Sequence, residues 1–196
     1  SKLMLLVHLF GLSGGVLTAI LCAGLCYVGS MSLISTPSVS LEGKNFWILR
    51  SMPVSSKTIL LGKLRLHLLC CVPLNVLSGL VLALTYGCGP INALLASLIP
   101  GLFGVLSGVL GLVFGLKWAR FDYISEAYPC KQSGSVAAAM FSLWGLVLVL
   151  GGGYYPLSPL LSPTGYLALC AGILALLSFA LYRLLLGWGV RKWESL

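Results

Sequence analysis

The feature that most constrains this chain is a series of long, unbroken apolar runs with almost no charged residue inside them. Each run approaches or exceeds the roughly 20 apolar residues that a helix needs to cross a ~30 Å hydrocarbon core. A transmembrane β-barrel would instead show segments of about ten residues that alternate between apolar and polar. With 59% hydrophobic and 8% charged residues, the chain also lies outside the range of water-soluble domains. We therefore expect an all-α integral membrane protein, because helices are the other structure that can span a bilayer.

The runs predict a single transmembrane domain over residues 1–196, a polytopic helical bundle with about five transmembrane helices. The first apolar stretch, residues 3–34, is too long for one span. We place its span at residues 12–34, with a kink at Gly14–Gly15, and interpret the preceding residues as the remnant of an upstream element. The other spans are expected at residues 66–86, 91–116, 135–155 and 166–188. The apolar run begins almost at Ser1, so we expect the sequence to be a portion of a longer protein.

Basic residues are confined to alternate connections between these spans. Of the twelve lysines and arginines, residues 36–65 hold five, residues 117–134 hold three and the C-terminal tail holds two, whereas residues 87–90 and 156–165 hold none. Short cytoplasmic loops carry an excess of Lys and Arg. We therefore expect the N-terminal end of the first span outside and the C-terminus in the cytoplasm. The formal charge of +8 follows from this topology, and no nucleic-acid partner is expected.

No constellation of catalytic or metal-binding residues is visible in the sequence. The candidates for acid–base chemistry are His8, His67, Asp122 and Glu126, which form no catalytic pattern. For His67, beside Arg65, we favour an interfacial position. The seven cysteines are scattered and odd in number, and no histidine or carboxylate accompanies them at metal-ligand spacing: Cys22, Cys26, Cys70, Cys71, Cys88, Cys130 and Cys170. No G-x-x-x-x-G-K-[ST] phosphate loop is present either. We expect neither catalysis nor a bound cofactor or metal, and any ATP-driven work requires a partner.

Glycines in the expected third span follow a helical spacing. Gly104, Gly108, Gly111 and Gly115 lie along one face, and they form two small-x-x-x-small pairs. Such pairs let membrane helices approach closely. The stripe therefore predicts a tight helix contact, either within the bundle or between subunits.

Pro73 and Asn75 are unusual residues in the expected second span. They could open the helix and expose backbone along a substrate path, since polar groups in lipid usually face the bundle interior. An ordinary kink with hydrogen-bonded packing explains them equally well.

The charged segment between the first two spans reads as two short helices. In the first, one face is expected to carry Leu41, Asn45, Ile48 and Met52, whereas Glu42, Lys44 and Arg50 point elsewhere. Pro53 stops this helix, and Ser55 or Ser56 can cap a second helix that continues into the membrane. We expect Phe46 and Trp47 to be exposed. Such an amphipathic helix rests in the lipid interface or docks onto a cytoplasmic partner, and its composition does not separate the two.

The segment from Ser40 to Leu64 begins Ser-Leu-Glu-Gly-Lys-Asn-Phe-Trp-Ile-Leu-Arg-Ser-Met-Pro-Val-Ser. This segment resembles the cytoplasmic loop of bacterial type-2 ABC exporter permeases, where versions of S-x-E-G-K-N-x-W-x-L-(K/R)-S-x-P-(V/I)-S recur. Lys131-Gln132-Ser133 is similar to the V-K-Q-S of a later cytoplasmic loop in such permeases. The order of spans is similar too, with one span before the loop and four after it. The family has a further span and a cytoplasmic segment upstream, so the resemblance also implies an N-terminally incomplete portion.

The resemblance implies a multi-pass permease subunit of an exporter in the bacterial plasma membrane. It implies a separate ATP-binding cassette subunit that carries ATP and magnesium, and a second permease copy or homologous half. It also implies a coupling helix that contacts the ATPase through Leu41, Glu42, Lys44, Asn45, Phe46, Trp47, Ile48 and Arg50. The alternatives are a secondary transporter or another polytopic membrane protein without an ATPase partner. A secondary transporter would normally show ion-binding polar groups near the midplane, and these spans contain almost no ionisable residues.

Overall fold

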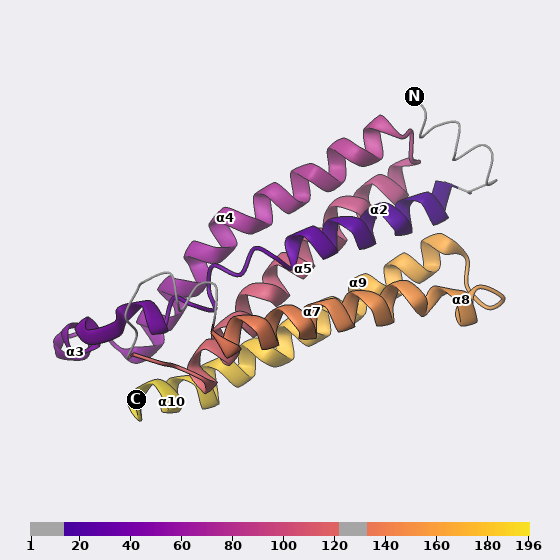
Figure 1. The fold of residues 1–196 in the computed structure, drawn as a ribbon. Coiled ribbons are helices and arrows are strands. Elements are labelled where there is room, and N and C mark those ends of the chain that lie inside the picture. Colours follow the sequence, from indigo (N-terminus) through magenta and orange to yellow (C-terminus); the bar gives the residue numbers. More distant parts are fainter. Residues whose placement is uncertain (1–13, 122–132) are drawn as a thin grey trace.

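The computed structural model describes residues 14–121 and 133–196, and this part of the chain is built from helices without strands. Figure 1 shows the helices as an elongated bundle. In chain order they are α2 (Gly14–Gly29), η1 (Ser40–Asn45), α3 (Phe46–Ser51), α4 (Ser56–Thr85), α5 (Pro90–Lys117), α7 (Gly134–Gly152), α8 (Tyr154–Leu157), α9 (Pro163–Leu184), the π-helical η2 (Leu185–Gly189) and α10 (Val190–Glu194).

Four helical stretches of the described chain are long and apolar enough to cross a membrane. They are Ser56–Thr85, Pro90–Lys117, Gly134–Leu157 and Pro163–Glu194. The helical, multi-pass membrane architecture expected from composition is therefore confirmed at this level. The first expected span, residues 12–34, begins outside the described residues. Its described helix, α2, covers 16 residues, about 24 Å at 1.5 Å per residue, and ends at Gly29, before the expected residue 34.

Helix α2 ends early because its last turn is held by side chains rather than by further helix. The Ser30 hydroxyl donates to the carbonyl of Tyr27 (2.5 Å) and accepts from the Trp144 indole N–H (2.8 Å). The rings of Tyr27 and Trp144 also stack, with centroids 5.3 Å apart. The chain then runs without regular helix to η1, and Ser35 and Thr36 lie buried against α5. Irregular backbone at membrane depth is tolerated where protein surrounds it.

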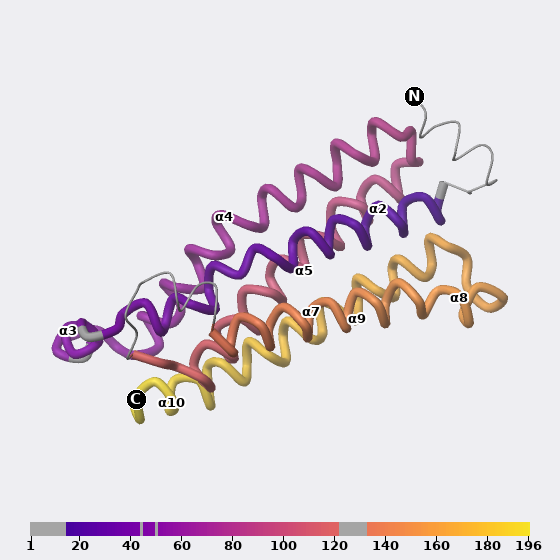
Figure 2. Tube along the Cα trace, in the orientation of Figure 1, coloured from indigo at the N-terminus to yellow at the C-terminus, as the bar shows by residue number. Residues whose placement is uncertain are grey.

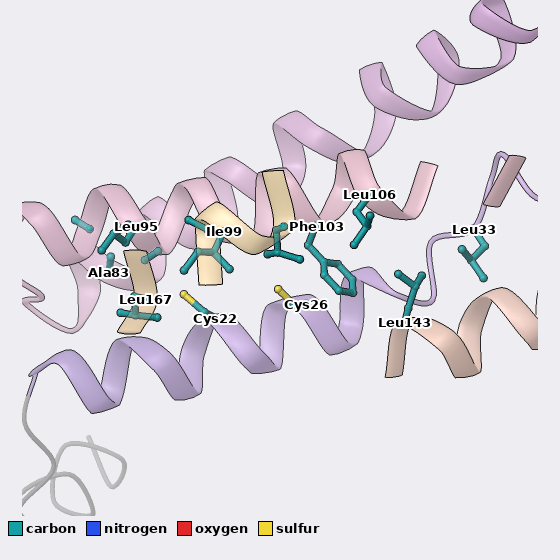
Figure 3. Close-up of a cluster of buried hydrophobic side chains, with 14 of the residues drawn as sticks. Cys22, Cys26, Leu33, Ala83, Leu95, Ile99, Phe103, Leu106, Leu143 and Leu167 are labelled. Carbon is teal, nitrogen blue, oxygen red and sulfur yellow. The ribbon is translucent and has the colours of Figure 1, made fainter. Parts of the chain in front are cut away.

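Helix α5 is the centre of the bundle. It packs against α2, α4, α7 and α9, and most of its length is buried. Its partners in the core include small residues such as Cys22 and Cys26 of α2, whose side chains in Figure 3 point toward Ile99 and Phe103. Small residues at membrane-helix interfaces let backbones approach without an overpacked core. The small cysteines of α2 therefore let this helix pack closely against α5.

Local sequence signals mark the helix ends. Ser55 caps α4 by accepting from the Thr58 N–H (3.3 Å), so Ser55 rather than Ser56 is the cap of the second loop helix. That helix continues through the apolar run as far as Thr85, ten residues longer at its start than the span expected from residue 66. Gly87 adopts a positive φ of 66° in the turn that follows, and Pro90 opens α5.

The two ends of the bundle differ. In Figures 1 and 2, α3 and the C-terminal α10 lie at one end, whereas α8 and the turn between α4 and α5 lie at the other. The described basic residues of the loops, such as Lys57, Lys117 and Arg191, belong to segments at the α3 and α10 end. Which end faces the cytoplasm stays a prediction from the charge distribution.

Candidate functional site

The segment expected to form one amphipathic helix, residues 41–51, is divided in two. Its first half is the 3₁₀-helical η1 and its second half is α3, six residues each. Within η1, Gly43 interrupts the helical backbone with φ 49°, a conformation that glycine adopts without a Cβ penalty. Helix α3 ends at Ser51, two residues before Pro53. The result is a short, bent element rather than a straight helix.

Phe46 is the anchor of this loop, which corrects the expectation that its ring is exposed. Its residue is 8% exposed, and its ring stacks on Phe121 (4.8 Å between centroids) and meets Trp193 edge-on (5.0 Å). Trp193 belongs to α10 and is 2% exposed. These three rings, here called the aromatic cluster, join the loop to the last helix of the chain. Aromatic pairs in such geometries contribute about 0.5–1.5 kcal/mol beyond their buried area.

Lys63 of α4 also holds the loop in place, through contacts that are separate from the ring stacking of Phe46. Its ammonium, on α4, forms an ion pair with Glu42 of η1, donates to the Ser38 carbonyl (2.7 Å) and lies 5.9 Å from the centre of the Trp193 ring. The Ser56 hydroxyl at the start of α4 also donates to Glu194 of α10 (3.2 Å). The loop, α4 and α10 therefore form one connected unit. Sequence reasoning missed Lys63 and Trp193. Neither residue belongs to a local sequence motif. The available signal for their roles was the mixture of apolar and basic residues in the C-terminal tail.

Several residues of this loop are exposed to the surroundings. Trp47 is 66% exposed although the neighbouring Phe46 is buried. Further exposed residues of the loop include Leu41, Asn45, Ile48, Met52 and Val54. We call Trp47 and these five residues the loop surface. The side chains of Lys44 and Arg50 lie outside the described part of the structure.

The glycine stripe of α5 lies against two different partners. A Cβ at Gly104 would come 2.9 Å from the Asn75 amide nitrogen, and one at Gly108 would come 2.5 Å from the His67 ring, both on α4. Further along, a Cβ at Gly111 or Gly115 would instead strike Ser35 and Thr36 in the irregular segment after α2. The contacts that the structure describes for these glycines lie within the chain, as the first alternative, packing inside the bundle, expects.

His67 is completely buried between α4 and α5. Its expected position at the membrane interface stays a prediction. Its Nε2 lies 3.2 Å from the Gly104 carbonyl oxygen and 3.2 Å from the Ser107 hydroxyl, which itself donates to that carbonyl (2.9 Å). Because a carbonyl only accepts, Nε2 carries a proton. The Cys71 thiol lies 4.0 Å from Nδ1 on the other side of the ring. His67 therefore ties two helices together, with no carboxylate in this network.

Pro73 and Asn75 have different surroundings, and a substrate path along them stays a prediction. The Asn75 amide donates to the Pro100 carbonyl (3.3 Å) and lies within the contact of α4 with α5, close to Gly29 of α2. Pro73 is exposed and lines a groove on the outer face of α4. The packing alternative thus describes Asn75 better than the substrate-path alternative.

An apolar cavity of about 160 Å³ lies between α2, α5, α7 and α9. Its walls include the thiols of Cys22, Cys26 and Cys170 among aliphatic and aromatic side chains. No group of three or more His, Cys, Asp or Glu able to hold a metal ion occurs within residues 14–121 and 133–196. The cavity suits apolar groups of about the size of benzene, which a dry cavity of this volume accommodates.

Several sequence predictions fall outside the described residues. They concern His8, Asp122, Glu126, Cys130, Lys131 and Gln132. Ser133 is described, and its hydroxyl caps α7 by accepting from the Val136 N–H (3.3 Å).

Comparisons with protein-family models, with curated proteins and with solved structures found no match to this chain.

Proposed function

We propose that this chain is the membrane-spanning permease subunit of an ATP-driven exporter. In this proposal a separate ATPase subunit hydrolyses ATP, and the loop of residues 40–55 receives the resulting movement. The chain has no phosphate-binding loop of its own, so the energy source is a partner. The proposal places the loop and the C-terminus on the cytoplasmic side of a bacterial plasma membrane.

The observation that carries the proposal is the contrast between two adjacent aromatic residues. Phe46 is buried in the aromatic cluster, whereas Trp47 is largely exposed on a helix of six residues. A helix this short is not stable alone in water, so its orientation depends on the anchor. Anchoring α3 through Phe46 fixes the direction in which Trp47 points. A preorganised, exposed tryptophan with apolar neighbours is typical of an interface hot spot.

The connections of the loop support a role in transmission. Phe46 and Lys63 link it to α10 and α4, and both of these helices continue directly into membrane-spanning segments. Movement of α3 would therefore displace two spans together. A helix that merely rested in the lipid interface would not need these links to the rest of the bundle.

The resemblance of residues 40–55 to the coupling loop of type-2 ABC exporter permeases identifies the partner class. The residues proposed to contact the ATPase are those of the loop surface, with Glu42 and Phe46 supporting them from behind. The apolar character of the spans and of the cavity favours an apolar or amphipathic cargo.

The direct test is purification of the tagged chain from its native membranes followed by measurement of magnesium-dependent ATP hydrolysis. We expect a co-purified subunit with a Walker-type phosphate loop, and ATP hydrolysis that depends on that subunit. A known ABC exporter purified from the same membranes, which should retain its ATPase subunit, serves as the control. If that control retains its ATPase and this chain is recovered without one, the proposal is contradicted.

A further inference from the structure

A groove on the outer face of α4 has the dimensions of one leaflet of a bilayer. It has a volume of about 660 Å³, within the range of small-molecule sites. Gly62, Leu66, Leu69 and Pro73 follow one another at helical four-three-four spacing along it, and Val105 of α5 contributes to its wall. From Gly62 to Pro73 the groove runs about 16 Å, close to half of a ~30 Å hydrocarbon core.

The lining of the groove is apolar and open to the surroundings. Leu69 is 76% exposed and Leu66 is also exposed, so their side chains form ridges rather than a closed core. At Gly62 an added Cβ would meet nothing within 4 Å, so the helix surface is open at this position. A single hydrocarbon chain can lie along such an apolar, open surface.

One end of the groove carries a positive charge. Arg65 lines it and is exposed, and no described residue forms an ion pair with its guanidinium. Side chains on a helix lean toward its N-terminus, which for α4 is the end nearest the basic loop. The guanidinium therefore extends toward the N-terminal end of α4, the end at which the basic loop predicts the lipid headgroups. Lys63 beside it is already engaged with Glu42 and Ser38.

We infer that this groove is a binding site for an anionic phospholipid. The lipid phosphate pairs with the Arg65 guanidinium, and one acyl chain lies along Leu66 and Leu69 toward Pro73. Arginine suits this role because its planar donors match phosphate oxygens. The inference depends on α4 spanning a bilayer and is independent of whether an ATPase partner exists.

The test is native mass spectrometry of the full chain released from mixed micelles that contain equal amounts of phosphatidylglycerol and phosphatidylcholine. We expect wild type to retain phosphatidylglycerol preferentially. Arg65→Gln should lower this preference about fivefold, the effect of one cation near the lipid surface. Gly62→Leu should reduce retention of both lipids, because its side chain fills the groove without striking protein atoms.

Two matched variants serve as controls. Lys57→Gln removes an exposed cation of the same loop region that does not line the groove, and Gly172→Leu adds the same side chain to an open position of α9. Both should behave like wild type. Equal loss of preference in Arg65→Gln and Lys57→Gln would show a diffuse charge effect and overturn the site. Equal lipid retention by Gly62→Leu and Gly172→Leu, or no preference in wild type, would overturn it as well.

Discussion

Glycines in this bundle differ sharply in what surrounds them. Gly79 of α4 is so close to α5 that a Cβ would lie 2.0 Å from the Ala96 carbonyl oxygen, whereas Gly172 and Gly145 have open space at the same position. The sequence alone distinguishes these residues only by spacing. Their neighbours decide whether a glycine permits a close approach or merely lies toward lipid.

Gly108→Leu should therefore destabilise the protein. A Cβ alone would come 2.5 Å from the buried His67 ring, which is fixed by its contacts with Gly104 and Ser107 and cannot move aside freely. Overpacking of this kind costs about 1–3 kcal/mol. Unfolding in detergent with increasing denaturant measures the change, and Gly172→Leu should leave the midpoint unchanged. Equal midpoints for Gly108→Leu and wild type would show that the α4–α5 contact is not tight at this position.

At the scale of elements, the docking of α3 depends on the aromatic cluster. Phe46→Ala should release η1 and α3 from α10, because it removes the ring that stacks on Phe121 and contacts Trp193. Truncation of a buried Phe typically costs about 3–5 kcal/mol. Hydrogen exchange should show faster exchange in residues 40–51 and 190–196 together. Trp47→Ala should change neither segment, since the Trp47 side chain is exposed. Protection that persists in Phe46→Ala would contradict the anchoring role.

Helix ends that are determined by neighbouring residues could be predicted from the sequence. The Ser55 cap, the end of α3 before Pro53 and the turn before Pro90 all follow from residues within a few positions of each boundary. The early end of α2 was not predictable in this way, because it depends on Trp144, far along the chain. The burial of Phe46 likewise requires Trp193 at the other end of the sequence. Long-range contacts of this kind leave no periodic signal.

For the whole molecule, the charge distribution predicts which end faces the cytoplasm. The loop with α3 and the C-terminal α10 share one end of the bundle, and α8 lies at the other. Single cysteines placed at Lys57 and at Ser158, both exposed, should react with a membrane-impermeant maleimide from opposite sides. Lys57 should be reached from the cytoplasm and Ser158 from outside, because short cytoplasmic loops hold the excess of Lys and Arg. Reaction of both from one side would refute this topology.

The bundle as a whole links an exposed loop surface to two spans through a few contacts. Phe46 meets Trp193 of α10, and Lys63 of α4 holds Glu42 of η1. An exporter subunit needs such links, since force applied at the loop must reach the membrane-spanning helices. We therefore propose that the exposed residues of α3, and Trp47 above all, bind the ATPase.

This binding can be tested by purifying tagged wild type and tagged Trp47→Ala from membranes that contain equal amounts of each. The ATPase subunit that co-purifies, and its ATP hydrolysis, are then compared. Loss of a central aromatic anchor costs ~2 kcal/mol or more, so recovery of the partner should reflect an affinity about thirtyfold lower. Phe179→Ala, which truncates an exposed aromatic residue of the α9 span, should retain the partner as wild type does. Equal recovery of an active ATPase by wild type and Trp47→Ala would contradict the coupling role of this loop.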